Sequence, residues 1–151
     1  MNIDRSNILP LDQFIEYALY DKNLGYYMKK NPFGLEGDFI TSPNITKLFS
    51  EIIAIWVITF WKSIGSPKKF NLLELGAGNG EMMKVIITTL KNFPEFFKNC
   101  NFCIHEKSAL LIKQQQQNLK SENVKWIDDI NKISSFPTIF LANEFFDALP
   151  I

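Results

Sequence analysis

The 151-residue sequence lacks an excess of charge of either sign. Lysine and arginine together number 16, as do aspartate and glutamate, so the formal net charge is zero. Arg5 is the single arginine. Binding to a polyanion such as DNA or RNA depends on clustered positive charge that contacts phosphates. The composition therefore argues against a nucleic-acid partner.

The sequence is also poor in residues that bind metal ions. It has two cysteines, Cys100 and Cys103, and a single histidine, His105. The C-x-x-C spacing fits a redox pair or half of a zinc site, but no second pair is present to complete a tetrahedral shell. Cys103 lies within an apolar strand pattern, so a small core residue at Cys103 beside a surface residue at Cys100 is the simpler interpretation. We expect no metal site.

Long hydrophobic runs are missing as well. The most apolar stretch, Ile52 to Trp61, is shorter than the ~18 residues that a membrane-spanning helix requires. Residues 1–10 contain Asp4 and no apolar signal core, so neither a secretory signal nor a transit peptide is visible. We therefore expect no membrane span. By default we expect a cytoplasmic location in a bacterium, or the mitochondrial matrix in a eukaryote.

Short apolar segments predict strands that alternate with helices. An apolar helix face falls at 83–90, and Ser108 can cap a further helix that carries the glutamine run 114–117. Because glutamine is a fair helix former, this run predicts a solvent-exposed helix face. The alternation predicts an α/β fold with a Rossmann-like sheet of about four parallel strands. The strands are expected at 70–75, 102–105, 124–127 and 138–142.

Helices and a long loop precede the first expected strand. Residues 11–19 have the apolar spacing of an amphipathic helix, and a hydroxyl followed by proline predicts the start of a second helix over 42–65. Residues 21–43, between them, form a glycine-punctuated segment that is typical of a lid or a binding loop. We expect an N-terminal part, 1–66, of helices and a cofactor-covering loop, and the first part of a Rossmann-like domain at 67–151.

The segment after the first strand carries a specific motif. It reads Glu74-Leu75-Gly76-Ala77-Gly78-Asn79-Gly80, a turn whose glycines adopt positive φ and let the backbone approach a ligand. The dinucleotide fingerprint G-x-G-x-x-G needs a third glycine at position 81, where the chain has Glu81. A carboxylate there opposes a pyrophosphate but not a cationic sulfonium. The turn from Glu74 to Gly80 therefore favours S-adenosylmethionine, and a dinucleotide such as NAD is the alternative.

Acidic residues follow the second and third strands, at the edge where open α/β sheets bind ligands. Glu106 can accept hydrogen bonds from the ribose hydroxyls of an adenosine. Asp128 or Asp129 can accept from its adenine amino group, and we assign this role to Asp128. The alternatives are an ordinary exposed acid at Glu106 and a charged turn at 128–129.

The segment after the fourth strand combines carboxylates with aromatic residues. Asn143, Glu144 and Asp147 can orient an acceptor nitrogen in line with a sulfur–methyl bond and stabilise the positive charge that develops on it. Glu144 can also receive the departing proton. The alternative is the capped start of a helix, with Asp147 in solvent and the phenylalanines in the core.

Four motifs follow one another in the order of one known family. Gly25-Tyr26-Tyr27, the segment 37–43, the glycine turn 74–80 and the segment 142–150 together resemble the MidA-type methyltransferases, whose mitochondrial members are complex I assembly factors. The resemblance covers residues 17–151. It implies a class I fold that uses S-adenosylmethionine to methylate a protein, which in the mitochondrial members is an arginine of a complex I subunit.

The resemblance also implies roles for individual residues. The residues expected to hold the cofactor are Gly76, Gly78, Gly80 and Glu106. The loop that covers the cofactor is expected to contribute Asp38 and Thr41. The residues expected to face the acceptor are Asn143, Glu144 and Asp147. An arginine acceptor suits these carboxylates, because guanidinium pairs with carboxylate in forked geometry.

The sequence departs from the family in two ways. The family's turn usually reads Gly-Pro-Gly-Arg-Gly, where this chain has Ala77 and Asn79. Family members are also over twice as long, and a sheet of four strands would leave 138–142 as an edge despite its buried pattern. We therefore expect the N-terminal part only, a fragment or split-gene half. Its expected partners are a protein substrate and a complementary C-terminal chain, and a fragment without activity of its own is the alternative.

Overall fold

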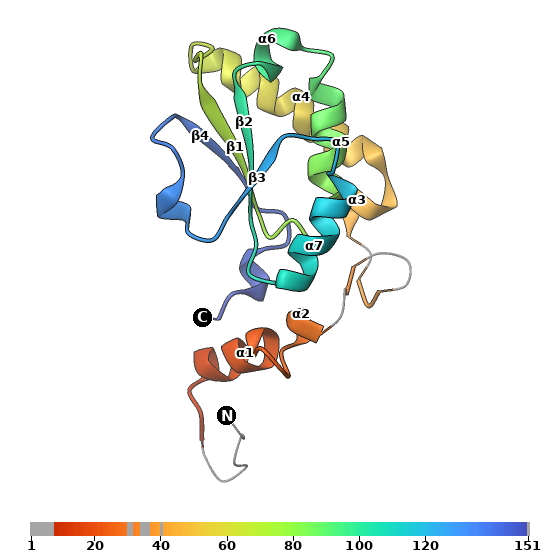
Figure 1. The fold of residues 1–151 in the computed structure, drawn as a ribbon, viewed down its shortest axis with the longest axis vertical. Coiled ribbons are helices and arrows are strands. Elements are labelled where there is room, and N and C mark those ends of the chain that lie inside the picture. The colour runs from red at the N-terminus through yellow and green to blue at the C-terminus, as the bar shows by residue number, and fades with distance from the viewer. Residues whose placement is uncertain (1–7, 30–31, 34–36, 40, 151) are drawn as a thin grey trace.

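Four parallel strands form the centre of the fold (Figure 1). The computed structural model describes residues 8–29, 32–33, 37–39 and 41–150. The order across the sheet is β3-β2-β1-β4, and both the α/β class and the parallel sheet are confirmed. The strands are β1 (Phe70–Leu75), β2 (Cys100–His105), β3 (Val124–Ile127) and β4 (Thr138–Leu141).

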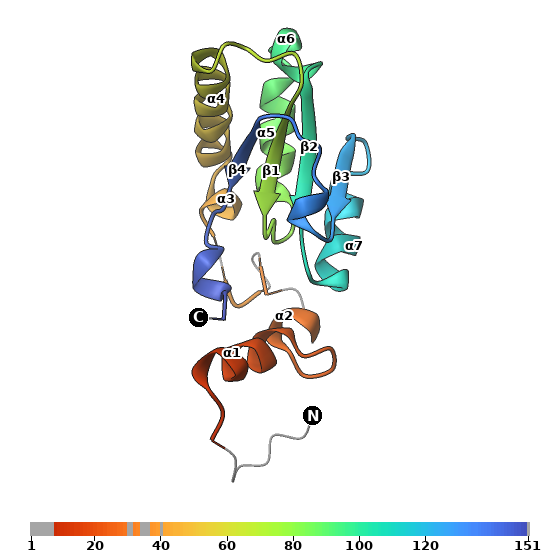
Figure 2. The same ribbon diagram turned by 90° about the vertical axis from the view of Figure 1, so that its left-hand side faces the viewer.

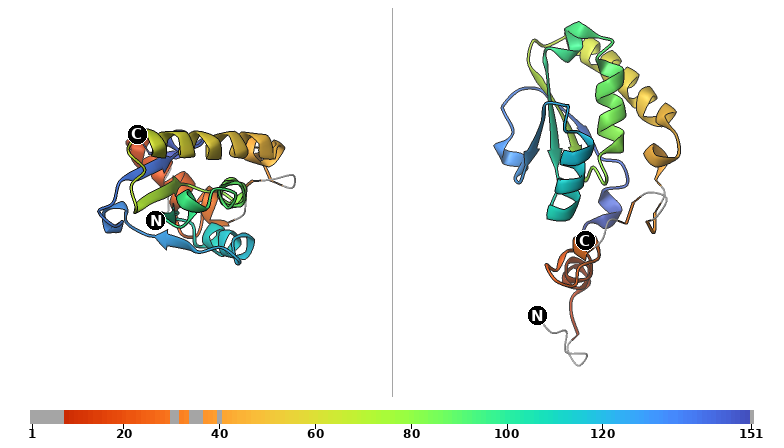
Figure 3. Two further views of the ribbon diagram at one scale, coloured as in Figure 1. Left: turned by 90° about the horizontal axis from the view of Figure 1, so that it is seen from above. Right: turned by 45° about the vertical axis from the view of Figure 1, so that its right-hand side comes forward.

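Three helices cover one face of this sheet. They are α4 (Lys47–Ser63), α5 (Glu81–Leu90) and α7 (Ala109–Asn118), and Figure 3 shows them on the same side of the strands. Their apolar side chains and those of the short helix α6 (Pro94–Phe97) form the main core with the strands. Its fully buried members include Leu72, Phe70, Met83, Ile86 and Phe96.

The opposite face of the sheet carries a smaller apolar cluster. Leu73, Leu75, Cys103 and Ile127 are its buried members, and Ile133 from the connection between β3 and β4 packs against them. That connection contains the 3-10 helix η1 (Ile130–Lys132), and a second one, η2 (Phe146–Ala148), follows β4.

The N-terminal helices lie beyond the carboxyl ends of the strands. These are α1 (Leu11–Tyr20) and α2 (Tyr26–Lys29), and Figure 2 shows both below the sheet, next to the last segment of the chain. They therefore lie at the edge of the sheet where ligands bind in open α/β folds.

The prediction of one helix over 42–65 is wrong. The chain forms a short helix α3 (Ser42–Ile45), breaks at Thr46, and begins again as α4. Thr46 has extended backbone angles (φ −150°, ψ 138°), and its hydroxyl accepts a hydrogen bond from the Leu48 N–H at 3.2 Å. A threonine that caps α4 in this way cannot continue a helix through itself.

The division of the chain at residue 66 stays a prediction. Although α4 precedes that position, its Ala54, Val57 and Trp61 are buried in the main core with the strands. By contrast, α1 has no buried residue. Packing thus groups α4 with the sheet.

One edge of the sheet is free within the part of the chain that the structure describes. There β4 pairs only with β1, in the register Asn71↔Thr138 to Glu74↔Leu141. Phe140 of β4 is 51% exposed, and Trp56 on the neighbouring helix α4 is 49% exposed. Among these described residues, no helix has the length and apolar character needed to cross a bilayer.

Candidate functional site

The glycine turn between β1 and α5 has the backbone that its sequence predicts. Gly76, Gly78 and Gly80 have φ of +66°, +54° and +83°. A Cβ on Gly76 would come within 2.7 Å of the Phe145 ring, and one on Gly78 within 3.3 Å of the Phe33 ring. Backbone conformation thus disfavours side chains at all three positions, and lack of space adds to this at Gly76.

A cavity of about 320 Å³ opens beside this turn. This volume falls within the usual range of small-molecule sites. Segments far apart in the sequence contribute to its lining, which includes Tyr20, Tyr27, Phe33, Gly76, Gly78, His105, Glu106, Ile130, Glu144 and Phe145. A smaller adjoining cavity of about 40 Å³ shares Phe33, Gly76, Gly78 and Glu144 with it and adds Thr41, Glu74 and Asn143.

Glu74 places a carboxyl group in the wall of the smaller cavity. It is 3% exposed, and its Oε2 has no hydrogen-bond partner among the described residues. Burial, and then the nearby charge of Glu106, raise the pKa of Glu74 to about 8. A buried carboxyl without a partner is unfavourable, and a cation in the cavity would relieve it by pairing with the ionised form.

Glu106 follows β2 and lines the larger cavity. Its Oε1 accepts a hydrogen bond from the Ser108 N–H at 3.0 Å, and its Oε2 accepts one from the Gln115 side-chain amide at 3.2 Å. Burial raises the pKa of Glu106, while these donors act in the opposite direction. Both carboxylate oxygens are thus fixed in position at the cavity wall.

Gln115 is a residue of this site that the sequence analysis missed. The prediction of an exposed glutamine face holds for Gln116 and Gln117 but is wrong for Gln115, which is 0% exposed. Gln115 lies four residues after Leu111 and four before Leu119, and both leucines are buried. This i, i+4, i+8 spacing was the available signal, because it puts Gln115 on the apolar side of α7.

The loop after β4 brings two of its three predicted residues to the cavities. Asn143 and Glu144 line the smaller cavity, and Glu144 also lines the larger one. Asp147 is exposed and lines neither. Glu144 has a φ of +48°, which is uncommon for a residue with a side chain and typical of functional sites.

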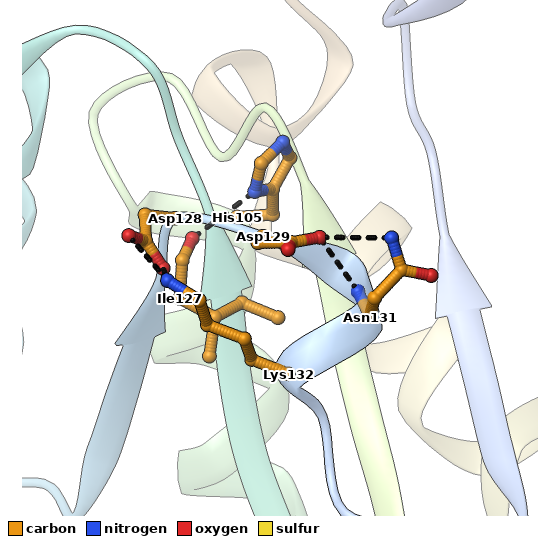
Figure 4. A network of polar contacts seen from close by, with 6 residues as sticks. All are labelled: His105, Ile127, Asp128, Asp129, Asn131 and Lys132. Atoms are coloured by element: carbon orange, nitrogen blue, oxygen red, sulfur yellow. Dashed lines mark hydrogen bonds and ion pairs between the residues drawn. The ribbon is translucent and has the colours of Figure 1, made fainter.

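The structure does not bring Asp128 into the cavity lining. Figure 4 shows its carboxylate paired with Lys132, whose Nζ lies 2.9 Å from both oxygens. This interaction lowers the pKa of Asp128. Asp129 instead accepts a hydrogen bond from the Asn131 N–H at 2.9 Å and so caps η1. An adenine-binding role for Asp128 stays a prediction.

Of the two residues predicted in the covering segment, only one lines a cavity. Thr41 lines the smaller cavity, whereas Asp38 is exposed, lines neither cavity, and accepts a hydrogen bond from the Tyr26 hydroxyl. The segment is attached to the site through the Ser108 hydroxyl, which donates to the Tyr27 carbonyl at 2.8 Å.

Cys103 lies in the core, as the simpler interpretation predicted, but Cys100 is half-buried and not a surface residue. Cys103 is 4% exposed in the smaller apolar cluster, and Cys100 packs against the main core. Burial raises the pKa of both thiols. Residues 8–29, 32–33, 37–39 and 41–150 contain no group of three or more metal-binding side chains.

Comparison with known proteins agrees with this geometry. A family model for S-adenosyl-L-methionine-dependent methyltransferases matches residues 52–151. The chain belongs to this family. The predicted methyltransferase resemblance, and S-adenosylmethionine as the cofactor of the family, are therefore confirmed.

The curated relatives are longer than this chain. The mitochondrial protein arginine methyltransferase NDUFAF7 homolog of Drosophila melanogaster is 32% identical over 95% of this chain and 38% of its own length. The human protein arginine methyltransferase NDUFAF7 is 30% identical over 92% of this chain and 37% of its own length. The chain thus spans less than two fifths of these relatives.

A solved structure has a similar fold over most of this chain. A protein from Burkholderia thailandensis, crystallised with S-adenosyl-homocysteine, superposes with a TM-score of 0.80 at 25% sequence identity. The match covers 94% of this chain and 38% of that one.

Proposed function

We propose that this chain forms the cofactor-binding part of a protein arginine methyltransferase. The observation that carries this proposal is the buried Oε2 of Glu74 in the smaller cavity wall, which has no hydrogen-bond partner among the described residues. S-adenosylmethionine bears an ammonium group and a sulfonium, and either cation can compensate a buried carboxylate. A dinucleotide offers a pyrophosphate, which Glu81 at the start of α5 would repel.

The proposed roles of the cavity residues follow from their chemistry. Gly76, Gly78 and Gly80 leave room for the cofactor along the turn, and Glu106 presents acceptors for its ribose hydroxyls. Thr41 approaches it from the covering segment. When bound, S-adenosylmethionine supplies a methyl group activated by its sulfonium charge. The fit rests on the buried Oε2 of Glu74, which lacks a hydrogen-bond partner among the described residues, and on the cavity beside Gly76 and Gly78.

We propose that the loop after β4 faces the acceptor. Glu144 lines both cavities, Asn143 lines the smaller one, and Asp147 lies on the same loop. A carboxylate can pair with a guanidinium, orient its nitrogen and accept the proton that methylation releases. The names of the relatives, protein arginine methyltransferases, support arginine as the acceptor, and the family resemblance supports a complex I subunit as its carrier.

We propose that further polypeptide completes the sheet on the side of β4. A groove of about 350 Å³ between α4 and β4 is lined by Trp56, Phe140 and other apolar side chains. Exposed apolar side chains beside a free strand edge favour the addition of a strand. The part of the Drosophila relative outside the matched region should co-purify with this chain but not with its Phe140→Asp variant. Phe93→Asp, at an exposed site near α6, is the control.

The location follows from the same relatives. Their names place them in mitochondria, which supports the mitochondrial matrix for this chain in a eukaryotic cell and the cytoplasm in a bacterial one. Fractionation of cells that produce the tagged chain tests this proposal, and recovery in a secreted fraction would contradict it.

The cofactor assignment is tested by calorimetric titration with S-adenosyl-homocysteine and, separately, with NAD. We expect binding of the first and none of the second. Glu106→Gln should weaken binding about tenfold, because a charged acceptor is lost. The control Glu95→Gln, on the exposed surface of α6, should leave it unchanged. Binding of NAD alone would overturn the proposal.

A further inference from the structure

Gln115 makes three hydrogen bonds from a fully buried position. Its Nε2 donates to the Gly78 carbonyl at 2.9 Å and to Glu106 Oε2 at 3.2 Å, and its Oε1 accepts from Trp126 Nε1 at 2.9 Å. One side chain on α7 thus contacts the glycine turn after β1, the carboxylate after β2 and the indole of β3.

The chemistry of these partners fixes the orientation of the amide. An indole N–H can only donate, so it requires the amide oxygen of Gln115. The Gly78 carbonyl and the ionised carboxylate of Glu106 can only accept, so both require the amide N–H groups. A flipped amide would face an acceptor with an acceptor and a donor with a donor. Trp126 therefore holds the donors of Gln115 toward the cavity wall.

This arrangement constrains the carboxylate that we assign to the ribose. Backbone N–H groups of Ser108 and Lys107 donate to Glu106, the first to Oε1 at 3.0 Å. The bond from Gln115 to Oε2 fixes the second oxygen and so the rotation of the carboxylate plane. An ionised carboxylate has about four acceptor sites, so acceptor capacity is left beside these donors for a ligand hydroxyl. The same amide also donates to the Gly78 carbonyl, so it fixes the position of the glycine turn relative to the Glu106 carboxylate.

We propose that Gln115 is a positioning residue, which sets the cofactor affinity of this chain by orienting Glu106 toward the ribose of the cofactor and by fixing the glycine turn through the Gly78 carbonyl. This inference rests on the proposed function, since it assigns Gln115 to the same site. Gln115 itself does not line either cavity, so its effect on a ligand is indirect.

The test compares two ligands on matched variants of the 151-residue chain. S-adenosyl-homocysteine and its 2′-deoxy analogue are titrated calorimetrically into wild type, Gln115→Leu, Gln115→Met and the control Gln117→Leu, which is exposed on the same helix. Gln115→Leu and Gln115→Met should weaken binding of S-adenosyl-homocysteine about ten- to a hundredfold, the usual effect of losing a hydrogen bond to a charged group. Gln117→Leu should match wild type.

The ratio of the two affinities separates positioning from stability. Wild type should prefer the ribose with both hydroxyls, and the Gln115 variants should lose most of that preference. If Gln115 had a purely structural role, its variants would bind both ligands more weakly by the same factor, and this result would overturn the inference. Failure of both Gln115→Leu and Gln115→Met to fold would also overturn it. In Glu106→Gln, a further Gln115→Leu change should cost less than in wild type, because the two residues act together.

The possible outcomes also distinguish this inference from the proposed function. If wild type binds S-adenosyl-homocysteine and the Gln115 variants bind it equally well, only the role of Gln115 is refuted. If wild type does not bind it, the cofactor assignment fails, and the role of Gln115 fails with it.

Discussion

The Glu74→Gln substitution isolates the buried carboxyl beneath the glycine turn. In the folded chain the pKa of Glu74 is raised from 4.5 to about 8, first by burial and then by the charge of Glu106. The unfolded chain releases this proton near its ordinary pKa, while the folded chain retains it until about pH 8. Folding stability of the wild type therefore falls as the pH rises through this window.

The size of the effect follows from linkage. At about 1.36 kcal/mol per pKa unit, the shift corresponds to about 5 kcal/mol in full. Relative to wild type, Glu74→Gln has no proton to lose and should gain about 1 kcal/mol at pH 5 and about 4 kcal/mol at pH 8. These figures are upper bounds, because water that enters near the turn would solvate the carboxylate.

The assay is urea unfolding at pH 5, 6, 7 and 8 without ligand, followed by calorimetric titration with S-adenosyl-homocysteine. Glu74→Gln should be the more stable protein but the weaker binder, because it cannot supply a negative charge to the ligand's ammonium group. Glu51→Gln, exposed on α4, is the control for both measurements. If Glu74→Gln had the same pH dependence of stability as wild type, or bound the ligand equally well, the reasoning about Glu74 would be refuted.

Three further predictions concern the turn and the loops around it. Gly76→Ala and Gly65→Ala both put a side chain at positive φ, but only the Gly76→Ala side chain meets Phe145. In urea unfolding, Gly76→Ala should therefore be less stable than Gly65→Ala by about 1–3 kcal/mol. Equal losses of stability in the two variants would refute the steric argument. Glu144→Ala should abolish methyl transfer by the assembled enzyme, measured with a radiolabelled methyl group, yet leave S-adenosyl-homocysteine affinity unchanged; lost affinity would move Glu144 out of the acceptor site. Asp128→Asn should change that affinity less than about twofold if Asp128 only forms its exposed ion pair with Lys132, and a large loss would confirm the predicted adenine-binding role.

The parts of the fold that the sequence predicts well are those set by local pattern. The strands at 70–75 and 124–127 have the predicted bounds, because mostly apolar segments end there at a glycine or an acidic residue. The second strand begins two residues earlier than predicted, at Cys100, and the fourth ends one residue earlier, at Leu141. The glycine turn was predictable in detail, since positive φ at alternate positions is specific to glycine.

The features that the sequence did not predict depend on tertiary contacts. Glutamine is usually exposed, and Gln115 can be buried because Trp126 and Glu106 form hydrogen bonds with its side-chain amide. The sequence alone does not show that these two residues lie next to it. Whether Asp128 reaches a ligand depends on the connection that carries Lys132, which pairs with it outside the cavity. The helical pattern over 42–65 is interrupted at Thr46, which caps α4 with its hydroxyl. The spacing of the apolar residues alone does not show this break.

The most direct test of the cofactor assignment is a crystal structure of the chain with S-adenosyl-homocysteine. We expect the ligand along the turn from Gly76 to Gly80, with the Glu106 carboxylate accepting from its ribose hydroxyls and its amino group next to the Glu74 carboxylate. A ligand bound elsewhere, or one at the turn that leaves Glu74 without a polar contact, would contradict the account.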